Sequence, residues 1–114
     1  MAITKAVASN VLSAVTTTQS STANSTTGDY AMAWYIKYVV ASGPSTAATF
    51  YIQQSPDASA YYNGPTYTCS LTNGTYYVGP IALDPTCEST IITFTAGTAG
   101  DYTFTAQLGQ VTGV

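Results

Sequence analysis

The clearest pattern in the chain is an alternation of apolar and polar positions with a period of two, which predicts β-strands. It is strongest in "YAMAWYIKYVVA", residues 30–41, where every even position is apolar. The even positions hold Tyr30, Met32, Trp34, Ile36, Tyr38 and Val40. The odd positions are also largely apolar, so we expect a central strand with Trp34 anchored in the core.

Shorter segments with the same alternation follow toward the C-terminus. The predicted strands are residues 46–54, 65–71, 76–83, 89–96 and 102–111. Their expected inward side chains are Ala48, Phe50, Ile52, Tyr67, Cys69, Leu71, Ile92, Phe94, Tyr102, Phe104, Ala106 and Leu108. No segment shows helical periodicity over a useful length. The chain therefore predicts an all-β protein, an antiparallel β-sandwich or jelly roll of about six to eight strands.

Two short motifs predict how neighbouring strands connect. Asn73-Gly74 in "LTNGTYY" suits the positive φ values of a type I′ turn, which would join residues 65–71 and 76–83 in a hairpin. Gly79-Pro80 predicts a bulge or kink in the returning strand.

The N-terminal region differs from the rest of the chain. Residues 16–29 are polar and of low complexity, which indicates a linker. We therefore divide the chain into an extended N-terminal arm with its linker, residues 1–29, and a β-sandwich domain, residues 30–114. The arm predicts either an edge strand or a segment that lies on a neighbouring subunit. Its candidate partner-binding residues are Ile3, Val7, Val11 and Leu12.

The composition argues against several classes of function. Charged residues make up only 6% of the 114 residues, against roughly 25% in ordinary soluble domains. Lys5 and Lys37 are the only basic side chains, which argues against binding to nucleic acid or to an anionic membrane surface. The N-terminus lacks the continuous apolar region of a secretion signal. We expect a protein made in the cytoplasm whose surface resembles that of an extracellular one.

Catalytic chemistry finds little support in the residues. The chain has no histidine, and its acids Asp29, Asp57, Asp84, Glu88 and Asp101 all lie at or beside predicted turns, where aspartate commonly bonds local amides. We predict no catalytic, cofactor-binding or metal site and no enzyme activity. Cys69 and Cys87 are expected as two reduced thiols or as a disulfide formed in oxidising surroundings.

Tyrosines are the remaining candidates. Tyr61, Tyr62 and Tyr67 surround Asn63-Gly64-Pro65. These tyrosines either fold back over the core or face a partner. We take Tyr61, Tyr62, Asn63 and Tyr67 as candidate partner-binding residues.

A longer run then suggests a family. "FYIQQSPDASAYYNGPTYT", followed by "TIITFTAGTAGDYTFTAQLGQV", resembles a pattern of small β-proteins in tailed bacteriophage virions. There a strand ends in Q-x-S-x-D-G, and an aromatic and a Gly-Pro-Thr segment follow. This chain has Ala58 after Asp57 where the pattern has glycine. The resemblance spans roughly residues 30 to 111.

The resemblance implies a capsid decoration (cement) protein on the virion surface. Such a protein is often a homotrimer at local threefold positions, binds the major capsid protein, and stabilises the head by bridging capsid subunits. The alternative function is a carbohydrate-binding or host-attachment module, with Tyr61, Tyr62, Tyr76 or Tyr77 stacking on sugars in a weak glycan contact. A tail or neck structural protein is a further alternative.

Overall fold

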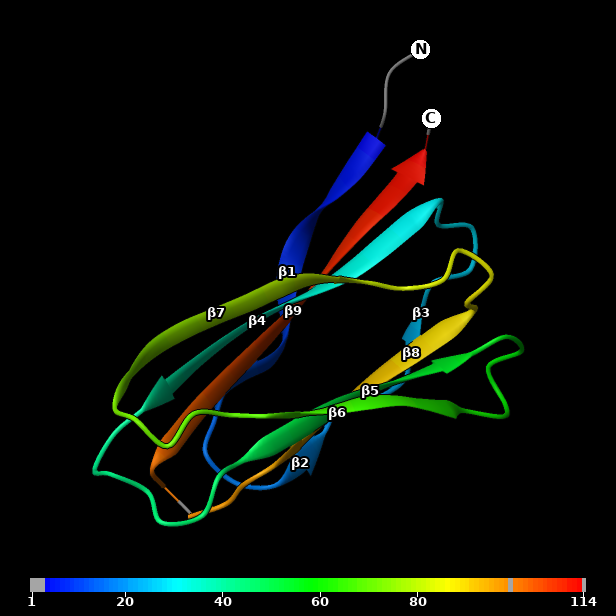
Figure 1. Ribbon diagram of the computed structural model, residues 1–114. Helices are drawn as coiled ribbons and strands as arrows, with labels where there is room; N and C mark the ends of the chain where they lie inside the picture. The colour runs from blue at the N-terminus through cyan, green and yellow to red at the C-terminus, as the bar shows by residue number, and fades with distance from the viewer. Residues whose placement is uncertain (1–3, 99, 114) are drawn as a thin grey trace.

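Two antiparallel sheets packed face to face make up the protein (Figure 1). The computed structural model describes residues 4–98 and 100–113, with the backbone alone for residues 6–9. No helix occurs in this part of the chain. The predicted all-β sandwich is therefore confirmed.

The first sheet has the strand order β1-β9-β4-β7. Its strands are β1 (Thr4–Val15), β9 (Tyr102–Gly113), β4 (Ala31–Val40) and β7 (Gly74–Ala82). β4 lies inside this sheet between β9 and β7, as its two apolar faces predicted.

The second sheet has the strand order β2-β8-β5-β6, and β3 also pairs with β8. Its strands are β2 (Gln19–Ser20), β3 (Asn24–Ser25), β5 (Thr49–Ser55), β6 (Tyr62–Thr68) and β8 (Ser89–Thr95). β2 and β3 interrupt the segment predicted as a linker.

The core lies between the sheets and contains most of the side chains that the alternation placed there. Phe104 of β9 contacts Phe50 and Phe94 of the second sheet, with ring centroids 5.3 and 4.6 Å apart. Trp34 is fully buried and its Nε1 donates a hydrogen bond to Thr90 Oγ1 at 3.1 Å. Aromatic packing and one buried hydrogen bond therefore join the two sheets.

Two expected core residues are exposed. Tyr30 is 56% exposed because β4 begins one residue later, at Ala31. Leu71 is 49% exposed because β6 ends at Thr68 and the chain has left the sheet.

The predicted hairpin between residues 65–71 and 76–83 is wrong. β6 pairs with β5 in the second sheet, whereas β7 pairs with β4 in the first. Asn73 therefore lies on a crossing between the sheets, and Gly74 begins β7. Asn73 does not have a positive φ. Its Oδ1 instead accepts a hydrogen bond from Gly43 N at 2.9 Å.

The kink predicted at Gly79-Pro80 is present. The peptide bond is cis, and the register of β7 against β4 shifts between Trp34 and Ile36. A Cβ at Gly79 would lie 2.8 Å from Trp34 O, so only glycine allows this close approach of the two backbones.

Of the two arrangements expected for the N-terminal segment, the structure shows the edge strand. β1 pairs with β9 from Thr4 opposite Gly113 to Val15 opposite Phe104. Its register shifts repeatedly, and Ala14 has a φ of 49°. The described ends of the chain lie together at one end of the sandwich (Figure 1).

Candidate functional site

The structure separates the candidate residues of β1 by their burial. Ile3 lies outside the described residues, and for Val7 only the backbone is described. Val11 is half-buried and packs against the core, and Leu12 is only 2% exposed. While β1 stays paired with β9, Leu12 serves the core and has no surface to offer a partner.

The candidate tyrosines divide in the same way. Tyr61 donates a hydrogen bond to Ser89 Oγ at 2.9 Å, and the ring of Tyr67 stacks on Phe50 with centroids 4.9 Å apart. Asn63 Oδ1 accepts a hydrogen bond from Gln53 Nε2 at 2.8 Å. Tyr62 is 66% exposed. Tyr61 and Tyr67 therefore stabilise the fold, while Tyr62 offers its ring to solvent or to a partner.

The turn before these tyrosines is held by Asp57. Its Oδ1 accepts hydrogen bonds from the amides of Ser59 and Ala60 at 2.9 and 3.0 Å and from Ser55 Oγ at 3.1 Å. These bonds, the one from Ala60 first, lower the pKa of Asp57. Ala58 has a φ of 60°, a left-handed conformation that glycine adopts more readily. The turn thus keeps a glycine-like backbone at the position where the phage pattern has glycine.

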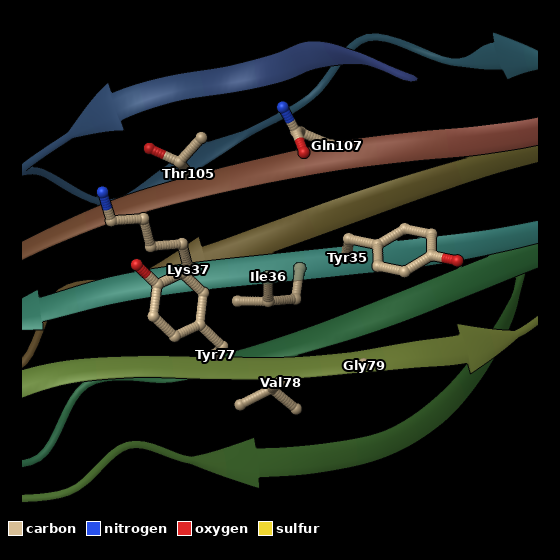
Figure 2. A pocket seen from close by; sticks show the side chains of 8 residues that line it. All are labelled: Tyr35, Ile36, Lys37, Tyr77, Val78, Gly79, Thr105 and Gln107. Carbon is tan, nitrogen blue, oxygen red and sulfur yellow. The ribbon is translucent and has the colours of Figure 1, made fainter. Parts of the chain in front are cut away.

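Two open hollows lie on the outer face of the first sheet. Two hollows of about 270 and 640 Å³ share Tyr35 and Gln107. Figure 2 shows the smaller hollow, with Lys37 and Tyr77 side by side, Tyr35 further along β4, and Thr105 and Gln107 on β9. We call the surface formed by Lys5, Tyr35, Lys37, Tyr77 and Gln107 the lysine–tyrosine face.

Small residues explain why this face is hollow. Ala33 of β4 lies opposite Gly109 of β9 and opposite Ala82 of β7. Since none of these side chains extends beyond a methyl group, the floor is low. A Cβ at Gly109 would lie 3.1 Å from Tyr35 Cε2. The ring of Tyr35 therefore lies over Gly109 and forms a wall between the hollows.

Strand register fixes the sides of the face. Lys37 lies opposite Tyr77 on β7 and opposite Thr105 on β9, and Tyr35 lies opposite Gln107. Gln107 Nε2 donates a hydrogen bond to Asn10 Oδ1 at 2.8 Å. Tyr77 is 77% exposed and Tyr35 45%. The exposed rings thus stand beside polar side chains that β9 and β1 hold in place.

Both basic side chains of the protein line this face. Lys37 lines the smaller hollow and Lys5 the larger one. Among the described residues, no acidic side chain lines either hollow, although the lining residue Gln110 donates a hydrogen bond to Asp29. The chain as a whole has a net charge of −3. The lysine–tyrosine face is therefore locally positive on an otherwise acidic molecule.

The sequence does not single out this face because both faces of β4 are largely apolar. The odd positions Ala31, Ala33, Tyr35, Lys37 and Val39 form the second face of this central strand. That face is the outer one. Lys37 and Tyr35, the two large polar side chains among these positions, were the signal that could have identified it.

The cysteines are buried and free. Cys69 N bonds Ala48 O just before β5, whereas Glu88, next to Cys87, bonds Ser55 O at the end of β5. The length of β5 separates them by about 20 Å, far beyond the reach of a disulfide. Burial raises the pKa of the Cys69 thiol to about 11, so at neutral pH it is protonated. In this fold the two thiols are unpaired.

Two negative findings concern the described residues. Within residues 4–98 and 100–113, no three His, Cys, Asp or Glu side chains come together as a metal site. The same residues contain no helix that is long and apolar enough to cross a membrane.

The fold and this face define a class of protein, a small β-sandwich with an open, hollowed sheet face. Comparisons with protein-family models, with curated proteins and with solved structures found no match.

Proposed function

We propose that this protein is a structural component of a phage virion, a capsid decoration protein that binds the outside of the head and stabilises it. The observation that carries the proposal is the lysine–tyrosine face. It combines exposed Tyr35 and Tyr77 with only two charges over two hollows. Aromatic rings with few charges are typical of the centre of protein interfaces.

The turn at Asp57 supports the resemblance on which the proposal also rests. Ala58, which stands where the phage pattern has glycine, takes a left-handed conformation that glycine adopts readily. The sequence departs from the pattern there, while the backbone keeps a conformation that suits glycine.

The edge of the first sheet supports attachment to a larger assembly. β1 is twelve residues long and its outer side is the sheet edge. An edge strand can gain main-chain hydrogen bonds from an added strand. In the proposal, β1 contacts the shell, bridging major capsid subunits, and Tyr62 is a second contact.

Binding to heads tests the proposal. Purified protein is mixed with heads that lack it, and both cosedimentation and the heat resistance of the heads are measured. The proposal predicts saturable binding and a higher temperature of head disruption. Replacing Tyr62 with serine is the contact variant, and replacing the packed Tyr61 with phenylalanine is its matched control. Absence of both binding and protection would rule the proposal out.

The second candidate function is carbohydrate binding, which the smaller hollow favours. Tyr77 and Tyr35 present exposed rings beside Gln107 and Lys37, and aromatic faces with nearby amides can hold a sugar ring. A glycan array measures this directly, with Tyr77→Ala as the control that must lose any signal. An array without signal removes the candidate.

A tail or neck position is a third reading of the same structural role. It differs from decoration in the number of copies on the particle.

A further inference from the structure

We infer that the lysine–tyrosine face binds a second copy of this chain, through the acidic end of that copy's sandwich. The inference rests on the proposed function in treating this face as a protein interface. It assigns the face to contact between neighbouring copies of the chain, while the edge of β1 contacts the shell.

The acidic end is formed by two loops that follow β5 and β7. Glu88 N donates a hydrogen bond to Ser55 O at 2.7 Å, and Asp84 N donates one to Gln54 Oε1 at 2.9 Å. These bonds hold residues 83–88 beside the end of β5, where Asp57 lies. Both loops lie at the same end of the molecule in Figure 1. We define the acidic end by Asp57, Asp84 and Glu88, three of the five acidic side chains in the chain.

The carboxylates of this end are oriented by local hydrogen bonds. Asp84 Oδ1 accepts from Thr86 Oγ1 at 2.7 Å and from Thr86 N at 2.9 Å. Glu88 Oε2 accepts from Thr27 Oγ1 at 2.6 Å. Since the carboxylates are held in place before any contact forms, an approaching cation pays less for ordering them.

Charge and shape are complementary between the two surfaces. The lysine–tyrosine face carries both basic side chains over two hollows. The acidic end consists of loops that close the end of the sandwich. Tyr62 lies beside them at the start of β6, opposite Gln54, and its ring is exposed. Each surface therefore offers an exposed tyrosine and the charge that the other lacks.

The register of the first sheet gives the span that the second copy must bridge. Lys5 and Ala31 lie opposite the same residue, Val111, on either side of β9. Lys37 follows Ala31 by six positions on β4. With about 3.3 Å per residue and 4.8 Å between strands, the two lysine Cα atoms lie roughly 22 Å apart. The molecule measures 48 × 30 × 18 Å, so one end of the sandwich is wide enough to reach both lysines.

The size of the end limits the strength of the contact. An area set by the two shorter extents, 30 and 18 Å, is on the order of 500 Å² per partner, below the roughly 800 Å² of a standard stable interface. The contact joins two different surfaces, so it repeats from copy to copy and forms a ring or an open chain. We expect reversible, concentration-dependent assembly that weakens in high salt.

Charge reversal tests the inference. The face variant carries Lys5→Glu with Lys37→Glu, the end variant carries Asp84→Lys with Glu88→Lys, and the swap variant carries all four. Sedimentation equilibrium over a concentration series at low salt measures assembly. We expect the wild type to assemble and the face and end variants each to need on the order of tenfold higher concentration. The swap variant should recover assembly, since its charges are complementary again.

A second set of variants separates an effect on assembly from an effect on folding. Asp57→Asn, Asp84→Asn and Glu88→Gln keep an acceptor oxygen at each position and remove the charge. This neutral set should weaken assembly, and circular dichroism at the assay temperature checks that it stays folded. The inference is overturned by a wild type that stays monomeric throughout, by a folded swap variant that stays monomeric, or by a face variant that assembles like the wild type.

The head-binding assay separates this inference from the proposed function. A wild type that assembles but does not bind heads defeats decoration and leaves the self-contact standing. A wild type that binds heads but stays monomeric defeats the self-contact and leaves decoration standing.

Discussion

Replacing Phe104 with leucine tests whether the two sheets pack as described. Phe104 belongs to β9 and is fully buried. Its ring contacts Phe50 and Phe94, which belong to the second sheet. The substitution keeps an apolar side chain in place and removes both aromatic contacts between the sheets.

The expected cost follows from these contacts. Each aromatic pair contributes about 0.5–1.5 kcal/mol beyond area burial, and a leucine fills most of the remaining space. We therefore expect the free energy of unfolding to fall by about 2 kcal/mol. For a domain of this size that corresponds to a Tm lower by roughly 8 °C. Phe104→Ala should cost about 4 kcal/mol, because a cavity is added.

Chemical denaturation and thermal melting monitored by circular dichroism measure both variants. Tyr77→Ala is the control, because its ring is 77% exposed and its loss should change stability by less than about 0.5 kcal/mol. Combining Phe104→Leu with Phe94→Leu measures their coupling. If Phe104→Leu costs no more than Tyr77→Ala, Phe104 does not lie between the sheets and the described packing is wrong.

Three further predictions follow from single sites. Cys69 should resist thiol reagents at neutral pH until the protein unfolds, because burial raises its pKa to about 11; rapid labelling of the native protein would contradict its position. Hydrogen bonds lower the pKa values of Asp57 and Asp84 below 3.8. The main donor is Ala60 N for Asp57 and Thr86 Oγ1 for Asp84. The ionised carboxylates therefore stabilise the folded protein above pH 3.8, and this stability is lost as the pH falls through their pKa values in the folded protein. Asp57→Asn should flatten the acid side of the curve of unfolding free energy against pH. An unchanged curve would refute this. Gly97→Ala should destabilise the protein strongly, because a Cβ there would lie 2.1 Å from Thr46 O; a wild-type Tm would show that the two loops do not approach.

The alternation of side chains predicted much of the core, because burial on one face of a strand leaves a period of two in the sequence. The side chains at the even positions are buried as expected, from Met32 to Val40 in β4 and from Tyr102 to Leu108 in β9. The errors at Tyr30 and Leu71 are at strand ends, where the pattern continues past the hydrogen-bonded residues.

The pairing of strands was harder to predict, since alternation does not say which sheet a strand joins. Asn73-Gly74 suits a hairpin locally, yet the partner of β7 is β4, far away in the sequence. That pairing depends on packing between the sheets, which the two residues of a turn do not encode.

The candidate site was predicted only in part. Tyr62 is exposed as a contact residue should be, while Tyr61 and Tyr67 are held by Ser89 and Phe50. Tyr35 and Lys37 could have indicated the lysine–tyrosine face, but Lys5 comes to the same sheet face only through the pairing of β1, β9 and β4. Residues from four strands, β1, β4, β7 and β9, form it.

The number of copies per particle tests the proposed decoration function most directly. Quantitative mass spectrometry of purified virions gives the ratio of this protein to the major capsid protein. We predict a ratio comparable with one copy for every few capsid subunits, as decoration of the whole shell requires. Absence from the virion, or only the few copies that a neck or tail ring holds, would contradict the account.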